Sequence, residues 1–77
     1  MSEQEWIDCF GDNLLEIMRD RGFNVEMLAD ETNISRMTIY RYLKKESMPN
    51  IKNIIKIAYT VACSFDKLLD FGETIID

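Results

Sequence analysis

Between residues 22 and 50 the chain carries a closely spaced series of residues that end and begin helices. Gly22 is the residue type that most often ends a helix in the left-handed conformation, and Asn24 is a preferred cap of the next helix. Asn33 tolerates the positive φ of a tight turn, and Ser35 is again a cap. The sequence therefore predicts a helix of barely two turns, from residue 25 to about residue 32, and a second short helix directly after it, from residue 35 to residue 43.

A longer helix is predicted before this segment. Ser2 and Glu5 have the spacing of a capping box, in which a hydroxyl and a carboxylate satisfy backbone amides reciprocally. Gly11 should weaken the middle of this helix by about 1 kcal/mol relative to alanine, so that the stable part would begin nearer Asp12. The core-facing side is predicted to carry Trp6, Phe10, Leu14 and Ile17.

Two further helices are predicted after residue 43. Residues 44–49 are polar and end at Pro49, which indicates a loop, and Asn50 caps the helix that follows. Ser64 should cap a short fifth helix, and the apolar tail 71–77 either folds back on the domain or makes a dimer contact. The core-facing residues are predicted to be Ile51, Ile54, Ile55, Ile57, Ala58 and Val61 in the fourth helix, and Phe65, Leu68 and Leu69 in the fifth.

Length and composition favour one small all-helical domain over residues 1–77. The chain has room for a single core, and 47% apolar residues with three glycines and one proline argue against disorder. No stretch resembles a signal peptide or a membrane span, so we expect a cytoplasmic protein. The absence of histidine removes the commonest general base and argues against an enzyme. Cys9 and Cys63 sit in apolar helical patterns, where we expect free thiols and neither a metal nor a cofactor.

Charge is distributed unevenly along the chain. The net charge of −5 argues against binding to nucleic acid, since affinity for phosphates comes from lysine and arginine. Residues 1–34 and 57–77 are acidic, however, whereas residues 35–56 hold six basic residues against the single acid Glu46. This basic segment is either a surface for an anionic partner or an ordinary solvated face.

The segment GFNVEMLADETNISRMTIYRYLKKESMPN, residues 22–50, and the later run IIKIAYTVACSFDKLLDF together resemble the helix-turn-helix domains of phage repressors, Cro proteins and Xre-like bacterial regulators. The resemblance covers about residues 12–70 and leaves 71–77 as a tail. It implies an all-α, compact five-helix, lambda-repressor-like domain, with the helix-turn-helix at its second and third helices. The matching positions are Gly22, Leu28, Ala29, Ile34, Ser35, Arg36, Thr38, Ile39, Arg41, Pro49, Ile57, Ala58, Ser64, Asp66, Leu68 and Leu69.

Several positions depart from the family pattern. Val25 stands where members usually have a glutamine that contacts a phosphate. Many members pair an arginine of the first helix with a glutamate at the end of the third, and here Met18 and Leu43 occupy those positions as an apolar pair. That exchange is physically reasonable, because a buried ion pair is often no more stabilising than well-packed apolar residues. The other departures are Asn33 and Lys45 in place of glycines and Thr32 in place of an apolar residue.

The resemblance implies that the third helix lies in the major groove of double-stranded DNA, with its N-terminal residues at the base edges. By position, the base contacts would come from Arg36, Met37, Tyr40 and Arg41. Contacts to phosphates would come from Asn24, Ser35, Thr38, Lys44, Lys45, Ser47 and Asn50. It further implies a transcriptional regulator, a small phage-type or Xre-like repressor, that binds a palindromic operator as a homodimer without a cofactor or small-molecule ligand.

A second interpretation is a protein-interaction module, antitoxin-like or an adaptor, that keeps the fold but does not bind DNA. The missing glutamine at Val25, the net charge of −5 and the apolar side chains of Met37 and Tyr40 favour it. The position of Arg36 and Arg41 favours DNA, although a fold alone does not establish a function.

Overall fold

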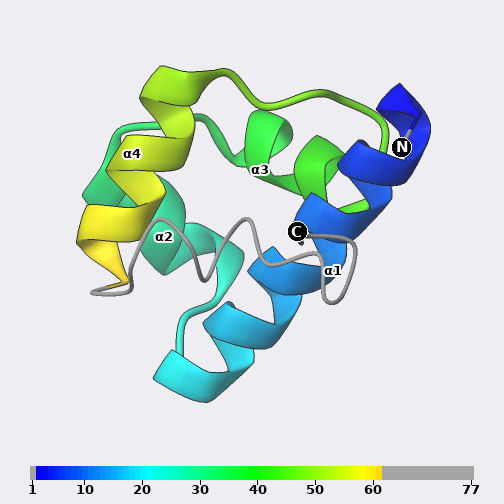
Figure 1. Ribbon diagram of the computed structural model, residues 1–77. Coiled ribbons are helices and arrows are strands. Elements are labelled where there is room, and N and C mark those ends of the chain that lie inside the picture. The colour runs from blue at the N-terminus through cyan, green and yellow to red at the C-terminus, as the bar shows by residue number, and fades with distance from the viewer. Residues whose placement is uncertain (1, 62–77) are drawn as a thin grey trace.

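The computed structural model describes residues 2–61 and is helical throughout its regular elements (Figure 1). The helices are α1 (Glu3–Arg21), α2 (Val25–Thr32), α3 (Arg36–Leu43) and α4 (Ile51–Thr60). The prediction of an all-α domain is confirmed for this part of the chain. The predicted fifth helix at Ser64 and the tail 71–77 lie outside the described residues, and within residues 2–61 the structure has four helices.

Each of these helices begins at a polar residue that caps it. The side chain accepts a hydrogen bond from the backbone amide three residues later, which satisfies one of the free amides of the first turn. The capping box of α1 is complete, because Ser2 Oγ accepts from the amide of Glu5 at 3.1 Å and Glu5 Oε1 accepts from the amide of Ser2 at 2.8 Å. The hydrogen bond from the Ser2 backbone lowers the pKa of Glu5 below its ordinary value of 4.5. The caps are Ser2, Asn24, Ser35 and Asn50, as predicted from the sequence.

Residues in the left-handed conformation separate the helices. Gly22, after α1, has φ of 74°, and Asn33, between α2 and α3, has φ of 63°. Lys45 adopts the same conformation with φ of 64°, in place of the family's glycine, at a modest cost in backbone strain. The predicted turn residues Gly22 and Asn33 are thereby confirmed.

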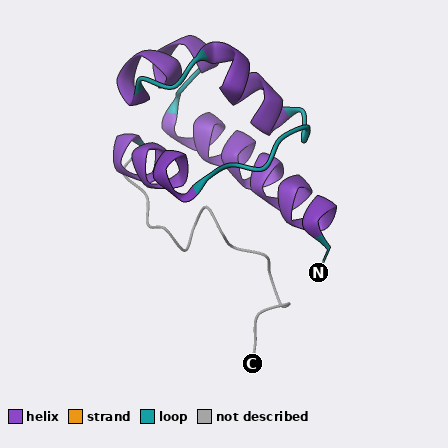
Figure 2. Cartoon of the chain, turned by 90° about the horizontal axis from the view of Figure 1, so that it is seen from above, coloured by secondary structure: helices purple, strands orange, loops and turns teal. Residues whose placement is uncertain are grey.

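The prediction that the stable part of α1 begins nearer Asp12 is wrong. The helix is continuous from Glu3 to Arg21, and Figure 2 shows it as one unbroken rod. Gly11 is buried where α1 packs against α3, and a Cβ atom added there would lie 2.7 Å from the carbonyl oxygen of Tyr42. The lost helix propensity is offset because glycine lets the two helices approach closely.

The core lies among all four helices. α2 packs against both α3 and α4, and α1 packs against α3 (Figure 1). The rings of Phe10 and Tyr42 meet edge to face at 5.7 Å, and the Tyr42 hydroxyl accepts a hydrogen bond from Asn53 Nδ2 at 2.8 Å. Met18 is buried in this core and Leu43 packs against it, which fits the apolar pair expected from the sequence. Buried residues are Ile7, Phe10, Leu14, Ile17, Met18, Leu28, Ala29, Thr32, Ile34, Ile39, Tyr42, Ile54, Ile57, Ala58 and Val61.

Two of the predicted core residues of α4 are exposed. Ile51 is 59% exposed and Ile55 is 42% exposed, whereas Ile54, Ile57 and Ala58 are buried. The apolar stripe of α4 is wider than the face that α2 can cover. Ile51 and Ile55 lie at the edge of this stripe and therefore remain in solvent. Their assignment to the core of the described residues is therefore wrong.

Candidate nucleic-acid interface

α3 has a buried side and an exposed side. Ile39 and Tyr42 face the core, with 0% and 3% exposure. Arg36, Met37, Tyr40 and Arg41 are all exposed, and their spacing of one, four and five residues places them on a common side of the helix. The structure therefore brings together the four residues expected to reach bases.

The N-terminal end of α3 is ordered by its own cap. Ser35 Oγ accepts from the backbone amide of Thr38 at 3.1 Å and donates to Thr38 Oγ1 at 2.8 Å. Both hydroxyls are thus engaged within the first turn, where the remaining free amides and the helix dipole create a site that favours negative charge. The positions of Ser35 and Thr38 suit a phosphate or base edge approaching this end.

α2 contributes three residues next to this end of α3. Asn24 is exposed, and its Oδ1 accepts from the amide of Met27 at 2.8 Å. Val25 packs against the core, so the position that usually carries glutamine in the family offers no polar contact here. Glu26, which no motif in the sequence indicates as a site residue, lies 3.9 Å from the guanidinium of Arg36.

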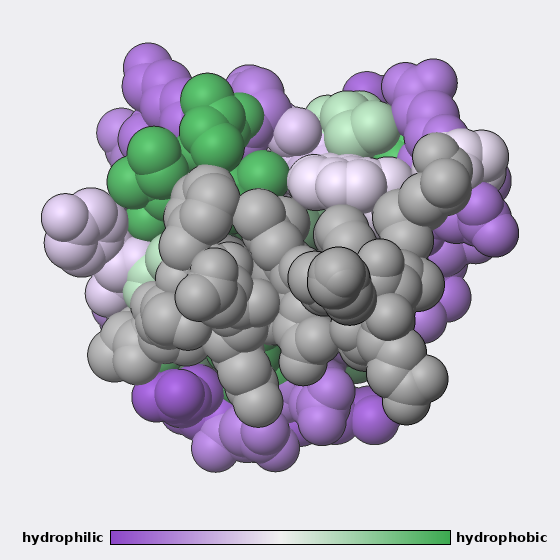
Figure 3. Space-filling view, in the orientation of Figure 1, coloured by the Kyte–Doolittle hydropathy of each residue, from purple (hydrophilic) through white to green (hydrophobic). Residues whose placement is uncertain are grey.

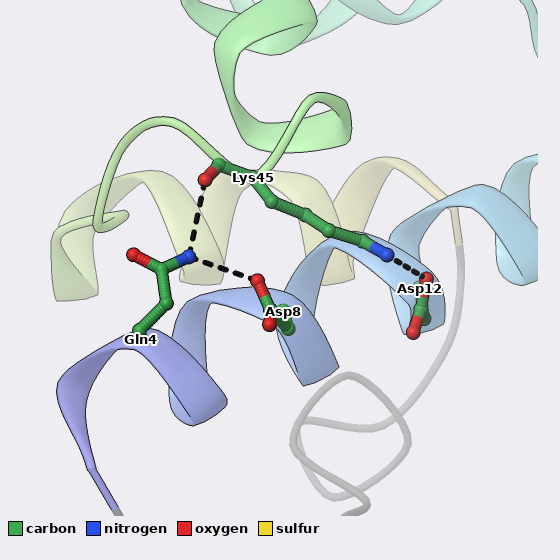
Figure 4. Close-up of polar contacts among 4 residues, drawn as sticks. All are labelled: Gln4, Asp8, Asp12 and Lys45. Atoms are coloured by element: carbon green, nitrogen blue, oxygen red, sulfur yellow. Dashed lines mark hydrogen bonds and ion pairs between the residues drawn. The ribbon is translucent and has the colours of Figure 1, made fainter.

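The lysines after α3 lie in different environments. Lys44, the C-cap of the helix, is exposed. Lys45 instead extends along α1, where its Nζ pairs with Asp12 Oδ1 at 2.8 Å (Figure 4). The hydrogen bond and the charge of Asp12 raise the pKa of Lys45 above its ordinary value of 10.5. Lys45 is thus directed toward α1 rather than toward the exposed side of α3.

The loop after α3 is also attached to α1 through its backbone. Gln4 Nε2 donates to the Lys45 carbonyl at 3.3 Å and to Asp8 Oδ1 at 2.9 Å (Figure 4). Of the other predicted phosphate contacts, Ser47 is half-buried in this loop, and Asn50 is exposed while its Oδ1 caps α4. The hydrogen bond from Gln4 to the Lys45 carbonyl and the ion pair of Lys45 with Asp12 fix the C-terminal end of α3 relative to α1.

A groove lies where α1, α2 and α3 meet. Tyr40 lines it from α3, and Arg19 lines it from α1. The signal for such a residue is weak in the sequence, because Arg19 and Tyr40 become neighbours only through the crossing of the helices. The full lining is Leu15, Met18, Arg19, Phe23, Asn24, Val25, Glu26 and Tyr40.

Among the described residues, no helix is long and apolar enough to cross a membrane.

A family model described as helix-turn-helix, HTH_3, matches residues 14–68. Among solved structures, the chain resembles an HTH_3 family transcriptional regulator from Vibrio cholerae, with a TM-score of 0.83 and 22% sequence identity. The match covers 87% of this chain and 38% of that one, so the chain spans well under half the length of this relative. No curated protein sequence matches.

Proposed function

The chain belongs to the helix-turn-helix family HTH_3, and from this premise we propose that it is a sequence-specific, double-stranded DNA-binding transcriptional regulator. The observation that carries the proposal is the division of α3 into two sides. Ile39 and Tyr42 fix the helix to the core, while Arg36 and Arg41 extend into solvent. A helix held in this way can enter the major groove with its arginines at the base edges.

Base recognition in this proposal rests chiefly on the two arginines. Each guanidinium can donate two parallel hydrogen bonds to O6 and N7 of guanine, a contact that contributes about 1 to 3 kcal/mol of discrimination. Met37 packs on a thymine methyl group, and Tyr40 lies at the margin of the contact. Guanines are therefore expected in each half-site.

Phosphate contacts position the domain without reading sequence. We assign them to Lys44 and to the polar residues around the starts of α2, α3 and α4. Lys45 joins them when its ion pair with Asp12 opens on binding, so its contribution should be smaller than that of Lys44. The polar group consists of Asn24, Ser35, Thr38, Ser47 and Asn50.

We further propose that the protein acts in the cytoplasm as a phage-type or Xre-like repressor and binds a palindromic operator as a homodimer. An exposed apolar row on α4 supports a contact between copies: Ile51, Ile55 and Tyr59 recur every four residues, and Figure 3 shows apolar surface over this helix. Tyr59, which is 84% exposed, can be replaced without disturbing the core.

Sedimentation of wild-type protein and Tyr59→Ala tests this surface. Loss of an aromatic residue from an interface should weaken self-association by about tenfold or more. The matched variant Tyr40→Ala removes an exposed tyrosine of α3, outside the apolar row of α4, and should leave self-association unchanged. A wild-type chain that remains monomeric on a single asymmetric site would contradict the dimer.

The function itself is tested by selecting binding sites from a random duplex pool. Arg36→Ala should relax the preference at the base that Arg36 reads. Lys44→Ala should weaken binding to all sequences and reduce the slope of log affinity against log salt by about 1. Lys52→Ala, an exposed lysine on α4, is the matched control and should change neither property.

The exposed apolar side chains of α3 favour one other function, a protein-interaction module. Met37 is 63% exposed and Tyr40 is 48% exposed, which is unusual for a surface that contacts only polar groups. If the selection yields no enriched sequence at low salt, this interpretation replaces the DNA-binding one.

A further inference from the structure

The ion pair between Glu26 and Arg36 joins the two helices of the helix-turn-helix at the end that faces DNA. Glu26 is the second residue of α2 and Arg36 the first residue of α3. Glu26 Oε2 lies 3.9 Å from Arg36 Nη1, and the two side chains are 69% and 60% exposed. A positive charge in the first turn of a helix is opposed by the helix dipole, so the carboxylate provides the compensation that α3 itself does not.

The pair is too weak to immobilise the arginine. A separation of 3.9 Å exceeds the range of a hydrogen bond, and ion pairs between exposed side chains contribute little to stability. The donor groups of Arg36 therefore remain available. What the carboxylate changes is the charge that an approaching acceptor meets at this position.

Two kinds of acceptor compete for Arg36 on DNA. A phosphate carries a full negative charge and is repelled by the nearby carboxylate, whereas O6 and N7 of guanine belong to a neutral base. At physiological salt this repulsion acts over roughly 8 Å, so it is restricted to groups close to Glu26. A carboxylate next to an arginine thus disfavours the non-specific contact more than the specific one.

We propose that Glu26 is a specificity-determining residue that acts through Arg36, directing the guanidinium to guanine by excluding phosphates from it. This inference rests on the proposed DNA-binding function. Glu26 also lines the groove that contains Arg19 and Tyr40, so an effect of its charge on Arg19 must be separated from its effect on Arg36.

The experiment compares Glu26→Gln with Glu31→Gln. Both glutamates are exposed on α2, and both variants remove one negative charge, but Glu31 lies at the other end of the helix. Site selection gives the base preferences, and titrations of the selected duplex and of an unrelated duplex at several salt concentrations give the ratio of specific to non-specific affinity. Circular dichroism verifies that both variants melt like the wild type.

Glu26→Gln should lower this ratio by about threefold to tenfold, mainly through tighter binding to the unrelated duplex. The preference at the base read by Arg36 should weaken, while the preference at the base read by Arg41 stays unchanged. Glu31→Gln should tighten binding to both duplexes equally. In an Arg36→Ala background, Glu26→Gln should no longer change the ratio, because a residue that acts through Arg36 has no effect without it.

Three outcomes overturn the inference. Glu26→Gln and Glu31→Gln could behave alike, or the effect of Glu26→Gln could persist in the Arg36→Ala background, which would assign it to Arg19 or to overall charge. In both cases the wild-type chain still enriches a site and the proposed function stands. A wild-type chain that enriches no sequence overturns the proposed function and this inference together.

Discussion

At Gly11, α1 lies close to the backbone at the C-terminal end of α3. A Cβ atom there would lie 2.7 Å from the Tyr42 carbonyl oxygen and 3.0 Å from Lys45 Cγ. The carbonyl belongs to the backbone and cannot move away without shifting the end of α3. The residue therefore sets how closely α3 packs against α1.

Gly11→Ala should consequently destabilise the domain. Overpacking costs about 1 to 3 kcal/mol, and the better helix propensity of alanine returns about 1 kcal/mol, so we expect a net loss of about 1 kcal/mol. Urea unfolding measures this loss, with Glu16→Ala, an exposed site on the same helix, as the neutral control. A variant more stable than the wild type would mean that α1 and α3 lie farther apart.

Lys45 is held at the same crossing by its ion pair with Asp12. Because the pKa of Lys45 is raised in the folded state, the stabilisation is fully present below the ordinary lysine pKa of 10.5 and is lost as the pH rises through the folded-state pKa. In an NMR titration of lysine side chains, Lys45 should titrate above 10.5. Asp12→Asn should return the pKa of Lys45 toward its ordinary value. An unchanged titration in that variant would show that Asp12 is not its partner in solution.

At the scale of elements, the turn between α2 and α3 contains hydrogen bonds of one buried hydroxyl. Thr32 is 4% exposed, and its Oγ1 donates to the Leu28 carbonyl at 2.7 Å and accepts from the Ile34 amide at 3.2 Å. A polar residue at a position where the family usually has an apolar one is thus satisfied on both sides. The Thr32 hydroxyl thus serves as hydrogen-bond acceptor for the Ile34 amide in place of a backbone carbonyl.

Thr32→Val keeps the volume of this side chain but removes the partner of the Ile34 amide. We expect a loss of about 1 to 3 kcal/mol in the free energy of unfolding, because a buried amide remains unsatisfied. Thr32→Ser keeps the hydroxyl and should lose only the contacts of one methyl group, about 0.8 kcal/mol. Equal stability of the valine variant and the wild type would show that water or another group satisfies the amide.

The boundaries of the helices could be predicted from the sequence where the residues that set them act locally. The caps Ser2, Asn24, Ser35 and Asn50 and the turn residue Asn33 act on backbone groups a few residues away, so the sequence alone identifies them.

The features that could not be predicted arise where two elements cross. The low helix propensity of glycine indicated a weak point at Gly11. The reason for a glycine there is the nearby Tyr42 carbonyl, whose position the sequence does not reveal. The orientation of Lys45 depends on Asp12, and the environment of Arg36 depends on Glu26, each from another helix. For the candidate site, the sequence therefore identified which residues are exposed on α3 but not which acidic groups face them.

At the scale of the whole molecule, charge and shape agree with one orientation on DNA. The basic residues Arg36, Arg41 and Lys44 belong to α3 and its C-cap, whereas α1 carries six of the fourteen acidic residues of the chain. With α3 in the groove, the acidic surface of α1 contributes repulsion at longer range and limits non-specific binding. A short helix on a small domain can then distinguish sequences despite a net charge of −5.

The most direct test of this account is a map of the surface that DNA contacts. Isotope-labelled protein is titrated with the duplex recovered by selection, and the shifts of its backbone amides are followed by NMR. The largest changes should fall on residues 35–44 and on the first turn of α2, residues 24–27, with the first half of α1 unaffected. Changes centred on α4 or α1 that leave α3 unaffected, or no change at saturating duplex, would contradict the claim that α3 reads DNA.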